Sequence, residues 1–188
     1  MGFLRKLLDE IVGKVNKQTH TVSAGGVCEL KVLPLEEVWK IEEHAKLVNE
    51  LGLYTIKKCA FGDDLSILSE AELVFYITQT VETNVNSDGF QHVLFYTEDD
   101  CIEQIVPAFL TIGAVKTAEI CKRALLAYGQ PLPRDITERQ NFIAEQDEAG
   151  NEEAGCLLNE CDEALYRYEE NLNELNYAYI MKNRTAFT

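Results

Sequence analysis

The chain has 188 residues, and its 32 Asp and Glu against 17 Lys and Arg give a formal net charge of −15 at pH 7. Such an excess of acid argues against direct binding of nucleic acid, because phosphate neutralisation requires clustered Lys and Arg. The length suits one domain with or without an appendage, and 46% hydrophobic residues suffice for a buried core. No secretory signal is visible and no apolar run approaches the roughly 18 residues of a spanning helix, so we expect a cytoplasmic protein.

Cysteine and histidine spacing gives no indication of a metal site. The cysteines are scattered without a Cys-x-x-Cys pair and the histidines are isolated: Cys28, Cys59, Cys101, Cys121, Cys156, Cys161, His20, His44 and His92. A structural zinc site needs such ligands in closely spaced pairs. We therefore expect reduced thiols, no bound metal and no other cofactor.

An amphipathic helix is predicted at the N-terminus. Its apolar stripe recurs at three- and four-residue spacing, with basic residues on the other faces, and consists of Phe3, Leu4, Leu7, Leu8, Ile11, Val12 and Val15. Such a stripe packs on the same chain, on a second subunit or on a membrane surface. We favour a protein surface over a membrane.

A loop or short strand is expected over residues 19–33, followed by a second helix. Pro34 suits the first turn of that helix, which should end before Gly52. Residues 53–68 are interpreted as a connection into the main body. We assign residues 1–65 to an N-terminal helical arm and connector.

The main body, residues 66–188, opens with a capping box. The Ser69 side chain can accept a hydrogen bond from the third helical N–H while Glu72 reaches back, so a helix is predicted from here to about Val85. Residues 84–89 are dense in Asn, Ser, Asp and Gly, which predicts a turn. A short aromatic helix should follow from Phe90.

Three more helices are predicted before the C-terminal segment. One should start at Thr97 and stop near Gly113, with a kink at Pro107. The next should cover residues 114–128. The third should open at Asp135 or Thr137 and be interrupted at Gly150.

The C-terminal segment has the most regular apolar pattern of the chain. Successive spacings of 3, 4, 3, 4, 3 and 4 residues separate Leu158, Cys161, Leu165, Tyr168, Leu172, Leu175 and Tyr179. This pattern predicts one long helix with a continuous seam. Because no stretch supports more than a hairpin-sized sheet, we predict an all-α multi-helix bundle with an N-terminal amphipathic helical arm.

Four segments of the chain resemble the bacterial DNA-mimic protein family, a family of helical domains: residues 69–73, 81–91, 110–114 and 165–170. The family turn is Glu-x-x-Val/Ile-Asn-Asn-Gly-Gly-Phe, and it is matched here by Glu82, Val85, Asn86, Gly89 and Phe90. Ser87-Asp88 replaces the usual Asn-Gly. The resemblance covers roughly residues 66–184. The resemblance implies a helical fold. The known representative of the family is similar to duplex DNA in its surface charge, and it relieves repression by occupying the DNA-binding face of a helix-turn-helix repressor.

Acidic residues are concentrated at the C-terminal end, where residues 135–188 hold 13 acids and 4 bases. On the predicted long helix the acids avoid the apolar seam and form an outward face. From Glu152 to Glu174 that helix would rise about 33 Å with eight acids, whereas duplex DNA of this length carries about 20 phosphates. Mimicry would therefore also need neighbouring acids, and a homodimer is plausible because an isologous contact buries surplus apolar stripes. The predicted partner-binding residues are Glu138, Glu145, Asp147, Glu148, Glu152, Glu153, Glu160, Asp162, Glu163, Glu169, Glu170 and Glu174.

The segment from Glu82 to Phe90 has two interpretations. It is either a structural corner or, alternatively, a metal-dependent hydrolase site in which Glu82, Asp88 and His92 hold a divalent ion. Phosphate-binding glycine loops and nucleophile motifs are not found in the sequence. We expect a non-catalytic interaction protein that binds a basic protein such as a transcriptional regulator, with a structural helical module as the further alternative.

Overall fold

The computed structural model describes residues 31–188, in which every regular element is a helix and none is a strand. The predicted all-α class is therefore confirmed for this part of the chain. The amphipathic helix expected in the first 15 residues and the loop expected over residues 19–30 lie outside the described residues. Within residues 31–188, no helix is long and apolar enough to cross a membrane.

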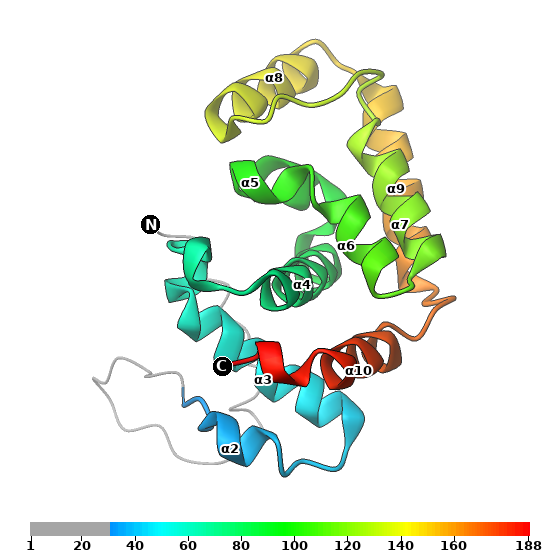
Figure 1. The fold of residues 1–188 in the computed structure, drawn as a ribbon. Helices are drawn as coiled ribbons and strands as arrows, with labels where there is room; N and C mark the ends of the chain where they lie inside the picture. Colours follow the sequence, from blue (N-terminus) through cyan, green and yellow to red (C-terminus); the bar gives the residue numbers. More distant parts are fainter. Residues whose placement is uncertain (1–30) are drawn as a thin grey trace, which may run out of the picture.

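The longest helix, α4 (Glu70–Tyr96), runs through the centre of the molecule (Figure 1). Around it lie α2 (Leu35–Val38), α3 (His44–Lys58), α5 (Asp99–Ile102), α6 (Ile105–Thr111), α7 (Val115–Leu125), α8 (Ile136–Glu148), α9 (Glu152–Tyr166) and α10 (Leu172–Lys182). Short 3₁₀ turns occupy Ala60–Gly62, Leu65–Ile67 and Arg184–Ala186. Helix α4 contacts α3, α6, α8, α9 and α10, so most of the other helices pack around it.

Two apolar clusters form the core. The larger one joins α4 to α5–α9 through fully buried side chains such as Phe90, Phe109 and Ile143. The smaller one joins α2 and α3 to α4, α10 and the C-terminal end, with Phe75 and Phe187 in edge-to-face contact at 5.8 Å. Residues 35–58 therefore pack directly on the body through α4 and α10.

The capping box of α4 is confirmed. Ser69 Oγ accepts from the Glu72 N–H at 3.2 Å, and the Glu72 carboxylate accepts from the Ser69 N–H at 2.9 Å. The Glu72 side chain is fully buried, and Lys58 Nζ donates to both of its oxygens at 2.7 and 2.9 Å. This pairing satisfies the buried charge and fastens the end of α3 to the start of α4.

The helix predicted from Pro34 to Gly52 is wrong in its boundaries. Helix α2 ends at Val38, and α3 then begins at His44 and continues through Gly52 to Lys58. Gly52 is buried inside α3, where a Cβ atom would lie at ordinary contact distance, 3.6 Å from Gln79 Oε1 of α4, so this glycine does not end a helix. Residues 53–58, expected in a connection, thus belong to α3.

The single helix predicted over residues 97–113 is also wrong, because α5 and α6 are separate. Pro107 lies in the first turn of α6, where its missing N–H would have no intrahelical partner. It therefore starts a helix and kinks none. Asp135 caps α8 as predicted, with its side chain accepting from the Glu138 N–H at 2.9 Å, and the chain turns at Gly150 with φ 72°.

The prediction of one continuous C-terminal helix is wrong. Helix α9 ends at Tyr166 and α10 begins only at Leu172, with Tyr168 between them in a left-handed conformation at φ 45°. Asn171 caps α10 by accepting from the Glu174 N–H at 3.2 Å. The apolar spacing continues across the break because both helices bury a stripe of the same period.

A buried arginine holds α8 in place. Arg139 is fully buried, and its guanidinium donates to the carbonyls of Leu94 at 2.7 Å, Arg134 at 2.6 Å and Pro133 at 3.1 Å, and also to that of Thr97. These acceptors lie at the C-terminal end of α4 and in the loop before α8. Burial lowers the pKa of Arg139, while nearby Asp99, Asp135 and Glu98 oppose that shift.

We expect Arg139→Met to lower the free energy of unfolding by at least about 3 kcal/mol, because it leaves buried carbonyls without donors. Urea denaturation of the full chain at neutral pH measures this change. The control is Arg134→Met, whose exposed side chain pairs with Asp100, and we expect no measurable shift of its midpoint. Equal midpoints for the two variants would contradict the role of Arg139 in holding α8 in place.

Candidate functional site

A kink at Gly89 shapes the family turn. Residues 84–88, predicted as a turn, remain within α4, and only Gly89 leaves helical geometry, at φ 78° and ψ 178°. The Phe90 N–H donates to Asp162 Oδ1 of α9 at 2.7 Å. A Cβ atom at position 89 would lie 2.6 Å from Asp162 Oδ2, so both the backbone conformation and the space require glycine here.

Two tyrosines complete this joint from the α9 side. Tyr166 Oη donates to the Val85 carbonyl at 2.9 Å, and Tyr168 Oη donates to Glu82 Oε1 at 3.0 Å while accepting from Asn86 Nδ2 at 2.5 Å. The predicted motif residues Glu82, Asn86, Gly89 and Phe90 are thus brought together, and they fasten α4 to α9 and the loop after it.

Burial raises the pKa of Glu82, and the hydrogen bond from Tyr168 only partly offsets this. Burial also lowers the pKa of His92, against the charge of Asp88. Within residues 31–188, no group of three or more His, Cys, Asp or Glu side chains is arranged to hold a metal ion. The contacts of Glu82 fit the structural-corner interpretation, and nothing in the described geometry favours the hydrolase.

The twelve predicted partner-binding acids fall into two groups. Seven lie on α8 and α9 or at their junction and make no ion pair with a described residue: Glu138, Glu145, Asp147, Glu148, Glu152, Glu153 and Glu163. All seven are exposed, although Asp147 accepts from the Gln91 amide at 3.2 Å. Residues 140–166 contain no Lys or Arg. These seven residues are here called the acidic face. They lie on α8 and α9, which follow one another along the chain, with α8 at the top of Figure 1 and α9 running down its right side.

The other five acids are engaged within the fold. Asp162 accepts from Phe90, and the remaining four make contacts to α7 or α3. These contacts are Glu160 with Arg123 at 3.1 Å, Glu169 with Lys116 at 2.9 Å, Glu170 with the Thr117 N–H at 2.8 Å, and Glu174 with His44 at 2.9 Å. Of the eight acids predicted to form an outward face of one long helix, Glu152, Glu153 and Glu163 are exposed without an ion pair to a described residue, and the other five make these contacts. That the twelve acids bind a partner stays a prediction.

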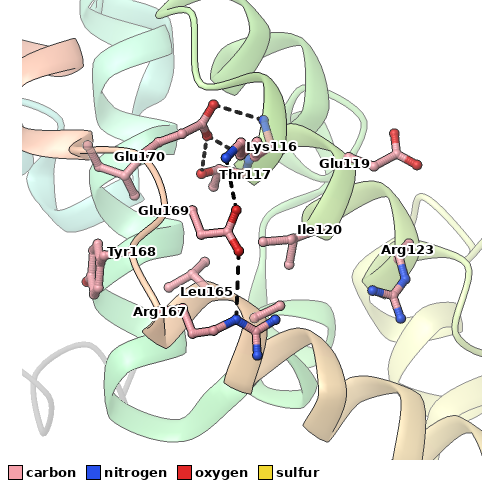
Figure 2. Close-up of a pocket in the computed structure, with 12 residues that line it drawn as sticks. Lys116, Thr117, Glu119, Ile120, Arg123, Leu165, Arg167, Tyr168, Glu169 and Glu170 are labelled. Atoms are coloured by element: carbon pink, nitrogen blue, oxygen red, sulfur yellow. Dashed lines mark hydrogen bonds and ion pairs between the residues drawn. The ribbon is translucent and has the colours of Figure 1, made fainter.

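Glu170 has a role that the sequence pattern does not reveal. Its carboxylate accepts from the Lys116 and Thr117 N–H groups and from Thr117 Oγ1, which caps the N-terminus of α7 from 53 residues away (Figure 2). Burial opposes ionisation of Glu170, but these hydrogen bonds together lower its pKa. An anion at a helix N-terminus is stabilised by the N–H groups and by the helix dipole.

A pocket of about 390 Å³ lies between α7 and the end of α9. Its apolar part includes Ile120, Leu165 and Leu172, and its rim carries basic side chains that are already paired with carboxylates. Glu169 lies between Lys116 and Arg167 (Figure 2). The pocket therefore has no uncompensated cation among the residues that line it.

The sequence profile of the family described as DMP19-like protein matches residues 66–183. The chain belongs to the DMP19-like family. The matched residues run from the 3₁₀ turn before α4 through α10, and they include the Gly89 joint and the whole acidic face. No curated protein and no solved structure matches the chain. Residues 31–65, with α2 and α3, lie outside the matched range.

We expect Gly89→Ala to destabilise the protein by at least about 2 kcal/mol, because alanine would adopt a glycine-only conformation and collide with Asp162. Gly155→Ala is the matched control. Gly155 lies in α9 with open space around it, so its replacement should instead stabilise by about 0.5–1 kcal/mol. Urea denaturation measures both changes. A Gly89→Ala protein as stable as wild type would contradict the requirement for glycine at this position.

Glu82→Gln should raise stability at neutral pH but not in acid. A carboxyl whose pKa is raised by folding contributes stability that is complete below its unfolded-state pKa and is lost as pH rises through the folded-state pKa. The glutamine side chain at position 82 does not ionise, so the variant does not lose stability as pH rises, and its amide oxygen can still accept the hydrogen bond from Tyr168. Unfolding free energies at about pH 4 and about pH 7 test this, relative to Glu103→Gln at an exposed carboxylate. A pH-independent difference between the two variants would contradict it.

Proposed function

We propose that the protein is a DNA mimic whose acidic face occupies the DNA-binding surface of a basic protein, without catalysis. Membership of the DMP19-like family supports a DNA-mimic role. The observation that carries the proposal is the set of seven exposed carboxylates on α8 and α9 that make no ion pair within residues 31–188. Residues 140–166 also contain no Lys or Arg. A transcriptional regulator is the class of partner we infer, because its DNA-binding surface presents clustered Lys and Arg.

The charge density of the acidic face limits how it can act. Helix α9 has 15 residues and rises about 22 Å, a length over which duplex DNA carries about 13 phosphates. The acidic face spreads seven carboxylates over two helices. The charge therefore acts mainly by steering a basic partner and by attraction that salt screens. We infer that the chain forms a dimer, because a second copy would bring the charge closer to that of DNA. Light scattering of the purified protein tests whether the dimer forms.

The test is affinity capture from the native lysate, elution with increasing salt, and competition with duplex DNA. We expect a basic DNA-binding protein to elute at moderate salt and to be displaced by DNA. A variant with Gln at five of the six Glu positions of the acidic face, which removes five of its seven charges, should bind this protein at least about tenfold more weakly. Its substituted positions are Glu145, Glu148, Glu152, Glu153 and Glu163.

The control removes the same number of charges from exposed carboxylates away from α8 and α9, and should bind like wild type. Its substituted positions are Glu36, Glu42, Glu43, Asp63 and Glu103. Equal losses in the two variants would show that only net charge matters. Capture that survives high salt, or that DNA does not compete with, would overturn the mimicry proposal.

A further inference from the structure

Two exposed aromatic rings lie beside the acidic face and are not accounted for by charge. Tyr166 and Tyr168 are 43% and 42% exposed, although both are large side chains at the α4–α9 joint. The Tyr166 hydroxyl is tied to the Val85 carbonyl and the Tyr168 hydroxyl to Glu82 and Asn86. Each ring is therefore held at a fixed position while much of it remains open to solvent.

Three carboxylates lie near Tyr166, and Tyr168 contacts the carboxylate of Glu82. The pKa of Tyr166 is raised, first by burial and then by the negative charges of Asp162, Glu163 and Asp88. Asp162 is committed to the Phe90 N–H, whereas Asp88 and Glu163 are exposed on α4 and α9. Arg167, which lies between the tyrosines in sequence, turns toward Glu169 with its Nε 3.9 Å from that carboxylate (Figure 2).

We propose that Tyr166 and Tyr168, with Asp88 and Glu163, form a docking site for arginine side chains of the basic partner. The proposal rests on the proposed function and names the side chain that the partner brings to it. A planar guanidinium can stack on a phenol ring while its N–H groups donate to a neighbouring carboxylate. A lysine ammonium lacks this planar fork, so the site favours arginine over lysine.

Prior fixation of the rings makes them effective anchors. Binding costs conformational entropy when it immobilises flexible side chains, and the hydroxyl contacts to α4 have already removed that freedom from both tyrosines. Tyrosine and arginine are also enriched among the few residues that dominate interface energies. The seven carboxylates then steer the partner, and the tyrosines discriminate among basic side chains.

The experiment measures binding of fluorescent deca-arginine and deca-lysine to the full chain at about 150 mM salt. We expect wild type to bind deca-arginine more tightly. Replacing both tyrosines, Tyr166→Leu with Tyr168→Leu, should weaken deca-arginine binding by about two- to fivefold per ring and leave deca-lysine binding nearly unchanged. Tyr96→Leu removes a tyrosine of matched exposure at the C-terminal end of α4 and should leave the preference for arginine intact.

Equal affinity of wild type for the two peptides would overturn the proposal, as would a double variant that loses both peptides equally. If the double variant does not fold, nitration of wild type gives the answer. Deca-arginine, but not deca-lysine, should protect Tyr166 and Tyr168 from nitration, and absence of that protection overturns the site. The peptides replace the natural partner, so the two proposals can fail separately. If the peptides show no preference for arginine but DNA competes with the captured protein, only the arginine site is refuted. If the arginine preference is found but DNA does not compete with capture, only mimicry is refuted.

Discussion

The hydrogen bond from the Phe90 N–H to Asp162 fixes the geometry on which the rest of the structure depends. A kink in a buried helix releases a backbone N–H that must find another acceptor. Gly89 creates that kink, and a carboxylate from 72 residues further along the chain satisfies it. Because Asp162 must face α4, the rotation of α9 is set, and its neighbour Glu163 is directed outward. Together with the buried Leu158, Cys161 and Leu165, this contact sets which side of α9 faces solvent.

Polar anchors of this kind offset the self-repulsion of an acidic surface. Clustered like charges destabilise a compact state, so α8 and α9 need contacts whose strength does not depend on the exposed carboxylates. Arg139 supplies such a contact for α8 through four backbone carbonyls, and Glu170 fastens the end of α9 to α7. The acidic face is thus supported from behind by buried hydrogen bonds.

The same residue type serves two purposes in this protein, and only its surroundings separate them. Asp162 and Glu170 accept backbone N–H groups, and Glu82 accepts from Tyr168. Glu152 and Glu153 make no ion pair with any residue in the described part of the chain. The net charge of −15 is therefore not carried by one surface, because some of the carboxylates lie between helices.

The sequence by itself determined what depends on neighbouring residues. The capping box at Ser69, the Asp135 cap and the all-α class all rest on local patterns within a few residues. The break before α10, the roles of Gly52 and Pro107, and the division of the twelve acids were decided only by tertiary contacts. Apolar spacing cannot reveal where a helix stops when the next helix repeats its period, and it cannot show that Glu170 caps a helix 53 residues away.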